Sequence, residues 1–266
     1  MKLRFSRSQL CIPYALFLAL FVVLPLVIVF YFALTDKSGN FSLANFSRFF
    51  FDPALISTMI VSMAIGAAAT IICLLLGYPV AYILARSGWH RKNVLLLLLV
   101  MPMWINFVLR INALKEFMQL IGILGKYNFL NTVLGMVYDF LPFMILPLYT
   151  TLIKIDKSLL EASADLGATP STTFLSVTLP LSTPGILSGI TMVFMPTMTV
   201  YVISDALGLG HVVILGKQIE HYFGSGDNWN MGSTIALVLL LVIFASTFLS
   251  NRFKDEESEE KGRALW

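Results

Sequence analysis

EASADLGATPSTTFLSVTLP, from Glu161 to Pro180, is a polar stretch inside an otherwise apolar chain. The 266 residues are 58% hydrophobic and only 12% charged, and the mean hydropathy is +0.83. A soluble domain averages about 45–50% apolar and about 25% charged residues, and it could not bury this much apolar surface. The composition therefore predicts a polytopic membrane protein, with the quoted stretch as a loop between spans.

Six apolar stretches are long enough to cross a membrane. A bilayer core of about 30 Å needs about 20 apolar residues per helix. The fifth stretch contains Pro184 and Pro196, which we expect to break it. The predicted spans are 11–34, 58–85, 93–114, 129–153, 179–205 and 232–250. The pattern predicts an all-α membrane protein with six transmembrane helices.

Lys and Arg are divided unevenly between the two sides of these spans. With an inside N-terminus, 12 of the 18 fall on the inner side and 6 on the outer side. Cytoplasmic loops are enriched in Lys and Arg, so both termini and the quoted stretch are expected in the cytoplasm. The apolar run from Cys11 to Leu34 exceeds the roughly 7–15 residues of a secretory signal, which predicts a retained first helix.

The sequence lacks the motifs of an enzyme that acts alone. GHVVILGK, from Gly210 to Lys217, has five residues between its glycines where an ATP-binding P-loop has four. Gln218 also stands where Ser or Thr would bind magnesium. The three histidines and two cysteines show no metal-site or disulfide spacing, and no nucleophile elbow is present. We therefore expect no catalytic residue, no metal site and no cofactor bound by this chain.

The quoted stretch predicts two short helices around a turn. Ser158 and Glu161 have the spacing of a capping box, and Gly167 suits a helix C-terminus. Thr169 and Pro170 fit a second N-cap followed by proline at the first helical position. Helices shorter than about 12–15 residues are marginal in water, so something must pack on them. Capping and periodicity leave open whether that is the chain's own spans or another protein.

The same residues resemble the signature loop of ABC importer permeases. That signature is Glu-Ala-Ala, three residues, Gly, nine residues and Ile-x-Leu-Pro. This chain has Glu161-Ala162-Ser163, then Gly167, then Val177-Thr178-Leu179-Pro180 at the same spacing. Ser163 and Val177 depart from the pattern by small or conservative changes. The resemblance implies a MetI-like, type I ABC importer permease fold, and thus a binding-protein-dependent inner-membrane transport component.

In that family the loop is a coupling helix that docks in a groove on a separate ATPase subunit. The resemblance implies this role for Glu161, Ala162, Leu166 and Gly167, in a coupling loop over about 154–178. It implies as partners an ATP-binding cassette ATPase dimer, a second and homologous permease subunit, and an extracytoplasmic solute-binding protein. ATP and magnesium would then be held by the ATPase subunit. A secondary transporter or a membrane-embedded enzyme has no use for such a loop.

Other segments resemble the first permease subunit of spermidine/putrescine importers. They are Met101-Pro102-Met103-Trp104, Leu141-Pro142-Phe143-Met144 and Tyr201-Val202-Ile203-Ser204-Asp205. The resemblance implies polyamine import and divides the chain into three parts. These are 1–54 (N-terminal tip, first helix and external loop), the permease core at 55–250, and an acidic cytoplasmic tail at 251–266. Sulfate, molybdate and iron importers share much of the pattern, so another inorganic or small organic ion is the alternative cargo.

Four residues are candidates for the path of a polyamine, a flexible polycation that carboxylates and aromatic faces can bind. Asp139 lies in the fourth apolar run, where acids are costly and often functional. Asp205 and Tyr201 are expected at the outer end of the fifth span, and Trp104 on the outer half of the third. The alternatives are an interfacial position for Asp139 and an aromatic-belt role for Trp104 and Tyr201.

Overall fold

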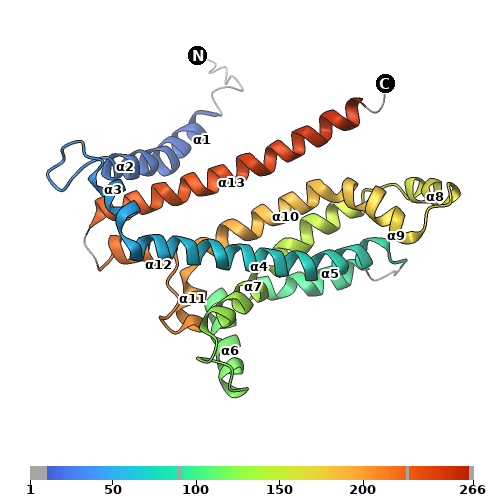
Figure 1. The fold of residues 1–266 in the computed structure, drawn as a ribbon, viewed down its shortest axis with the longest axis horizontal. Helices are drawn as coiled ribbons and strands as arrows, with labels where there is room; N and C mark the ends of the chain where they lie inside the picture. The colour runs from blue at the N-terminus through green and yellow to red at the C-terminus, as the bar shows by residue number, and fades with distance from the viewer. Residues whose placement is uncertain (1–10, 89–91, 226–227, 264–266) are drawn as a thin grey trace, which may run out of the picture. The chain divides into compact units, whose positions relative to one another are not determined.

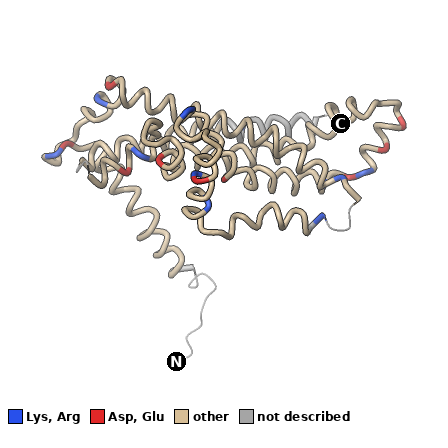
Figure 2. The backbone as a smooth tube through the Cα atoms, turned by 90° about the horizontal axis from the view of Figure 1, so that it is seen from below, with Lys and Arg blue, Asp and Glu red and all other residues tan. Residues whose placement is uncertain are grey.

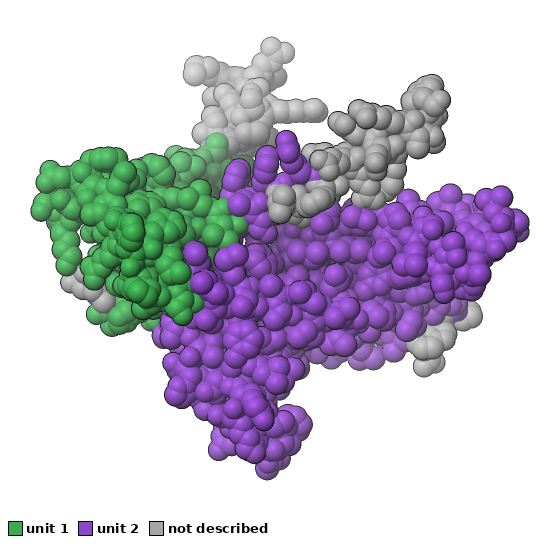
Figure 3. All heavy atoms as spheres, in the orientation of Figure 1, with its two compact units in different colours: residues 1–57, 218–242 green, residues 58–217, 243–266 purple. Residues whose placement is uncertain are grey.

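The computed structural model describes residues 11–88, 92–225 and 228–263, and regular structure in those ranges is helical (Figure 1). An isolated β-bridge between Thr35 and Phe41 is the one strand-type pairing there. The chain divides into two compact units (Figure 3). Unit 1 is Met1–Ser57 with Gln218–Val242, and unit 2 is Thr58–Lys217 with Ile243–Trp266. The predicted cytoplasmic tip at 1–10 and the end of the acidic tail at 264–266 lie outside the described residues.

Helices are the expected solution for so apolar a chain, because they satisfy their own backbone polar groups where no water is available. Short π or 3₁₀ segments, marked η, interrupt or join the α-helices. The elements in chain order are α1 (Cys11–Leu18), η2 (Ala19–Val23), α2 (Leu24–Ala33), α3 (Ala44–Phe51), α4 (Pro53–Arg86), α5 (Lys92–Val100), η3 (Met101–Trp104), α6 (Phe107–Leu120), α7 (Asn128–Leu152), α8 (Lys157–Asp165), α9 (Pro170–Thr173), η4 (Phe174–Thr178), α10 (Leu179–Thr199), α11 (Tyr201–Gly208), α12 (Leu215–Phe223) and α13 (Trp229–Arg263). The acidic tail up to Arg263 therefore continues α13.

Five described helices are long and apolar enough to cross a membrane. They are Pro13–Ala33, Pro53–Arg86, Asn128–Leu152, Pro170–Thr199 and Trp229–Phe248. Each overlaps one of the predicted spans. The fifth predicted span, 179–205, was expected to break at Pro184 and Pro196. The corresponding helix instead runs through both prolines and ends at Thr199. α11 then starts separately after the bend at Val200, so the predicted span over 179–205 begins where α10 does, at Leu179, but its predicted end at 205 was wrong.

The third predicted span, 93–114, was wrong as a single helix. Val94–Trp104 and Phe107–Leu120 form a bent pair with an angle of 94° between them. The break occurs because Asn106 starts a new helix, its side-chain oxygen accepting from the N–H groups of Val108 at 3.0 Å and Leu109 at 3.3 Å. The count of spans among the described residues is five, or six if the bent pair is one span.

α7 forms the centre of unit 2, with α10 and α11 packed along it. A Cβ added at Gly185 of α10 would lie 2.7 Å from Thr151 Oγ1, so only glycine allows this close approach. Gly77 of α4 also lies close to Met144 of α7, since a Cβ added there would lie 3.1 Å from that flexible side chain. Met144, Ile145 and Leu148 are fully buried between these helices. The tightly packed α4–α7–α10 layer is the scaffold that positions the polar elements at its ends.

Unit 1 joins α2 to the start of α13 through a buried asparagine. Asn230 Nδ2 donates to the carbonyl of Thr35 at 2.8 Å and to that of Phe32 at 3.1 Å. The rings of Phe32 and Trp229 lie 5.9 Å apart. The amide thus adds a side-chain donor to the carbonyls at the end of α2, where the Phe32 carbonyl also accepts from the Thr35 N–H at 3.4 Å.

Charged residues are sparse along the long helices (Figure 2). α10 carries none, α4 carries one at its last position, Arg86, and α7 carries one, Asp139. A charge inside an apolar helix needs a partner, because burying an isolated ion is costly. Asp139 and the charged residues at the helix ends are therefore the places to look for function.

Candidate functional site

The polar stretch forms α8 and α9, joined by a tight turn at Gly167, and we name α8, the turn and α9 the elbow. Gly167 has φ +80°, and its N–H donates to the Ala164 carbonyl at 2.9 Å. The N–H of Ala168 donates to the Ser163 carbonyl at 3.1 Å, which completes a Schellman motif. Thr169 accepts from the N–H of Thr172 at 3.3 Å and so caps α9. The predicted helix end and second N-cap are both confirmed.

The predicted capping box was wrong. α8 begins at Lys157, and its cap is Asp156, whose Oδ1 accepts from the Ser158 N–H at 3.0 Å. Hydrogen bonds from the Ser158 backbone, and next from its side chain, lower the pKa of the Asp156 carboxyl. Because the folded pKa is the lower one, the cap is complete above the ordinary aspartate pKa and is lost only as pH falls through the lowered value.

The elbow presents the predicted coupling residues on an open surface. All nine residues of α8 are described, and none of them is buried. Glu161, Ala162, Leu166 and Gly167 are exposed, and Leu166 has 89% of its surface accessible. Ser163 Oγ lies 2.9 Å from Thr173 Oγ1, so the residue that departs from the family pattern hydrogen-bonds α8 to α9. The described helices thus leave the apolar side chain of Leu166 uncovered.

One face of α4 holds both ends of the elbow. Tyr78, Tyr82 and Arg86 follow one another at intervals of four residues, which places them on one face of the helix. Arg86 Nη1 donates to the Ile155 carbonyl just before α8, at 3.3 Å. The Phe174 ring, just after α9, meets Tyr78 and Tyr82 edge-on, with centroids 5.8 and 5.6 Å apart. We name these contacts the α4 clamp.

The clamp also reaches α10, because Tyr78 Oη lies 2.8 Å from Ser182 Oγ. The sequence analysis predicted the second short helix but did not identify the partners of Phe174. The available signal was the pair of tyrosines one turn apart near the C-terminal end of the second span. The elbow, α4 and α10 are therefore joined by rings and hydrogen bonds inside one unit.

Asp139 is buried in the middle of unit 2, with 4% of its surface exposed, and forms an ion pair with Arg110 of α6. Arg110 is also buried and donates through Nη1 to the Pro102 carbonyl at 2.8 Å. Its guanidinium carbon lies 5.9 Å from the centroid of the Tyr138 ring. The pair fastens α6 to α7 immediately beyond the 94° bend. This burial favours a structural role for Asp139, and its direct role in a solute path stays a prediction.

Asp205 and Tyr201 lie one turn apart on α11 and share a partner. Lys217 Nζ at the start of α12 is 2.9 Å from Asp205 Oδ2 and 5.1 Å from the centroid of the Tyr201 ring. The side chains of Lys217 and Asp205 are 34% and 39% exposed, so this group opens to the surroundings. The structure thus brings two of the four predicted path residues together. No sequence signal pointed to Lys217, which lies twelve positions from the acid it pairs with.

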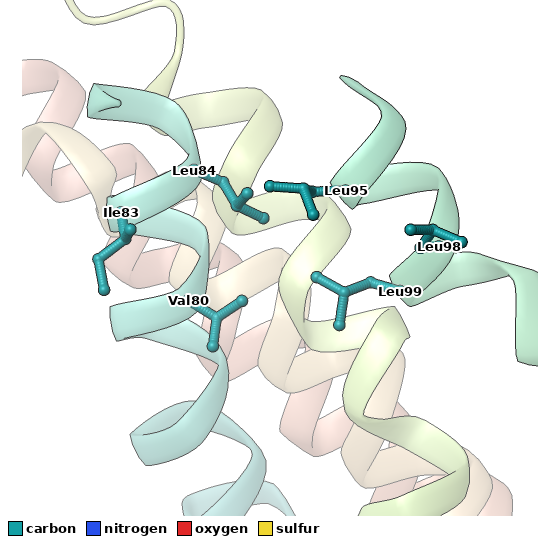
Figure 4. A pocket seen from close by; sticks show the side chains of 6 residues that line it. All are labelled: Val80, Ile83, Leu84, Leu95, Leu98 and Leu99. Carbon is teal, nitrogen blue, oxygen red and sulfur yellow. The ribbon is translucent and has the colours of Figure 1, made fainter. Parts of the chain in front are cut away.

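Trp104 lies in η3, at the bend, with 77% of its surface exposed. A hollow of about 370 Å³ between α4 and α5 is lined by aliphatic side chains (Figure 4). They are Val80, Ile83, Leu84, Leu95, Leu98 and Leu99. None of these six side chains can bind a charged solute. Among the described residues, then, the open group around Lys217 is the better match to a cation site.

Comparison with known sequences places these features in a family context. The family described as "Binding-protein-dependent transport system inner membrane component" matches residues 74–255. The chain is 33% identical over 270 residues to the spermidine/putrescine transport system permease protein PotB of Haemophilus influenzae, covering 94% of each. It is 34% identical over 247 residues to PotB of Escherichia coli K12, covering 85% of this chain and 90% of that one. The inner membrane ABC transporter permease protein YdcU of E. coli K12 is 29% identical, over 76% of this chain and 72% of its own length.

Solved structures share the fold. A bacterial ABC transporter involved in the import of the acidic polysaccharide alginate matches with a TM-score of 0.70 at 13% identity, covering 92% of this chain and 94% of that one. The MetNI methionine ABC transporter, in an inward-facing conformation, matches with a TM-score of 0.58 at 19% identity, covering 76% and 95%. The all-α ABC importer permease fold expected from the sequence is confirmed.

Proposed function

Because the chain belongs to the family of binding-protein-dependent transport system inner membrane components, we propose that it is the permease subunit of an ATP-driven polyamine importer. The cargo would be spermidine or putrescine. The observation that carries this proposal is the relationship to PotB, which extends over nearly the whole of both chains. The chain is accordingly a multi-pass component of the inner membrane, with apolar helices that cross it.

The proposed partners are an ATPase dimer, a second permease subunit and an extracytoplasmic binding protein. ATP and magnesium are bound by the ATPase, and this chain binds no cofactor of its own. The elbow supports this assignment of roles, because its residues Glu161, Ala162, Leu166 and Gly167 form a surface that is exposed in the part of the chain that the structure describes. The excess of Lys and Arg on the same side of the spans supports a cytoplasmic elbow and cytoplasmic termini.

The α4 clamp supports a route for the mechanical coupling. When ATP closes the ATPase dimer, the docked elbow moves, and a rigid connection passes that movement to the spans. Arg86 and the pair Tyr78 and Tyr82 hold the two ends of the elbow to α4, and Ser182 extends the connection to α10. Alternating access then follows as a switch between two packings of these helices.

The cargo's chemistry agrees with the open group on α11. A polyamine carries ammonium groups, which bind carboxylates and the faces of aromatic rings. We assign Asp205, Tyr201 and the exposed Trp104 to the path. Asp139 contributes by holding α6 in place through Arg110, since it is buried and already paired.

Reconstitution tests the function directly. The chain is assembled in vesicles with the candidate ATPase, second permease and binding protein, and uptake of radiolabelled spermidine is measured. We expect accumulation that requires ATP, that excess putrescine inhibits, and that excess sulfate leaves unchanged. Uptake of sulfate or ferric ion in place of spermidine would show that the permease belongs to an importer of another solute. Spermidine uptake that continues without ATP would rule out the importer itself.

Phe174→Ala should uncouple transport from ATP hydrolysis. The substitution removes both edge-on ring contacts of the clamp, each worth roughly 0.5–1.5 kcal/mol beyond buried area. A combined loss near 1.4 kcal/mol corresponds to about a tenfold fall in uptake. Uptake and ATPase activity are measured on the same vesicles, and ATP hydrolysis should continue.

Leu175→Ala is the matched control for this variant. Leu175 is the next residue on the same turn and is 60% exposed, so its removal leaves the clamp intact. The clamp assignment fails if both variants transport spermidine at the wild-type rate, or if both lose transport equally.

A further inference from the structure

The ammonium group of Lys217 lies in surroundings that would suit a foreign amine equally well. Its Nζ is 2.9 Å from the Asp205 carboxylate, which is hydrogen-bonding distance. The Tyr201 ring lies 5.1 Å away, within the range of a cation–π contact. The Asp205 carboxylate and the Tyr201 ring together form a cation subsite around one primary ammonium group. The cation that occupies this subsite is the side chain of Lys217.

The two groups that form this subsite are fixed by packing. Tyr201 and Asp205 lie one turn apart on α11, so their side chains leave the same face of the helix. The other face of α11 is fully buried at Ile203 and Leu207, which pack against Gly135 of α7. The carboxylate and the ring therefore keep their places whether or not Lys217 remains between them.

The backbone of Lys217 is anchored, while its side chain is about one-third exposed. A Cβ at Gly216 would collide with the Thr199 carbonyl, so the start of α12 is pressed against the end of α10. The Leu215 N–H donates to Ser62 Oγ at 2.8 Å, and the Lys217 N–H donates to the Ile214 carbonyl at 2.9 Å. Beyond this anchored backbone the lysine has a flexible stem of four carbons.

The buried pair elsewhere in the same unit provides a comparison. Arg110 is also held between a carboxylate, Asp139, and an aromatic ring, Tyr138. There both charged side chains are more than nine-tenths buried, and the guanidinium donates to a backbone carbonyl as well. Lys217 and Asp205 are about one-third exposed instead. Exposed ion pairs add little net stability, so the second arrangement can exchange its cation where the first cannot.

We propose that the Lys217 ammonium is a tethered stand-in for the cargo, and that an ammonium group of the polyamine displaces it from Asp205 and Tyr201 during transport. The proposal rests on the polyamine function proposed above and adds a residue that sets the strength of binding. Lys217 keeps the subsite filled when no cargo is present and competes with the cargo when it arrives. Removing the lysine should therefore strengthen cargo binding.

Binding of radiolabelled spermidine to the assembled complex in lipid nanodiscs tests this competition. Lys217→Met should bind spermidine about tenfold more tightly, because the subsite is then fully available. Adding Asp205→Asn to Lys217→Met should abolish the gain. Lys126→Met is the charge-matched control, since Lys126 is exposed in the loop between α6 and α7 and its loss removes one positive charge elsewhere. Lys217→Gln repeats the test with a polar side chain in case the methionine variant assembles poorly.

The possible outcomes separate this proposal from the function on which it rests. Suppose that the wild-type complex imports spermidine and that the Lys217 and Lys126 variants bind it with equal affinity. This result contradicts the proposed role of Lys217 but not the importer function. Weaker binding in Lys217→Met contradicts that role too, because the lysine would then hold the fold or attract the cargo. A wild-type complex that imports no spermidine removes both the function and this inference.

Discussion

Replacing Gly167 with valine should reduce ATP-dependent spermidine uptake by roughly tenfold or more, because a β-branched residue in the left-handed region costs about 1–3 kcal/mol. Gly167 has φ +80°, and its conformation closes the turn that directs α9 away from α8. A valine there favours another backbone conformation and opens the Schellman motif. ATP hydrolysis by the partner should persist, since the ATPase carries its own site.

Gly122→Val is the control for local strain. Gly122 has φ +70° and, like Gly167, has open space where a Cβ would be added, but it follows α6 and is not part of the elbow. Gly167→Asn should restore much of the uptake, because asparagine tolerates the left-handed region. Equal loss in the two valine variants would mean that strain in any loop stops transport, and the coupling assignment would fall.

Arg110→Met and Asp139→Leu should each destabilise the protein severely, by about 3–5 kcal/mol, because each leaves one buried charge without its partner. A shift of that size lowers the melting temperature on the order of 10 °C for a chain of this length. The double variant should recover most of the loss, since two apolar side chains then fill the space of the ion pair. Melting is followed in detergent for the wild type, both single variants and the double variant.

Lys217→Met provides the exposed counterpart in the same measurement. Its ion pair with Asp205 is about one-third exposed, so its loss should change the melting temperature little.

Spermidine uptake by the Arg110→Met, Asp139→Leu double variant then decides the role of Asp139. Uptake near the wild-type rate supports a structural role for Asp139. A double variant that folds but transports no spermidine would instead support a direct role of Asp139 in the solute path. Additive losses from the two single substitutions would contradict the pairing.

Local chemistry predicted the parts of this structure that depend on neighbours in sequence. The apolar runs indicated the spans, and Gly167 and Thr169 marked the turn and the second cap, because each acts on backbone groups within a few residues. The same reasoning was wrong about the cap of α8, where Ser158 and Asp156 both suit the position. Asp156 begins the helix earlier, and its oxygen reaches the second amide of the turn.

The rest depended on residues that are distant in sequence. Asp139 was recognisable as an unusual acid, but its partner lies 29 positions away, beyond a bend that the apolar pattern concealed. Phe174 meets tyrosines more than ninety positions earlier, and such a contact exists only once α4 and the elbow are assembled. The predicted break at the prolines of α10 was wrong for a related reason. Packing on α7 keeps this helix continuous despite its prolines.

The elbow lies at one end of a helix that runs continuously from Pro170 to Thr199. At 1.5 Å per residue its 30 residues span about 45 Å, so a tilt of about 5° at one end moves the other by about 4 Å. The end opposite the elbow is Thr199, whose carbonyl is pressed against Gly216, the residue before Lys217. A displacement of that size exceeds the 2.9 Å between Lys217 Nζ and the Asp205 carboxylate. Under the proposed coupling role, a small rotation of the elbow would therefore displace the opposite end of the helix by more than the separation of that ion pair.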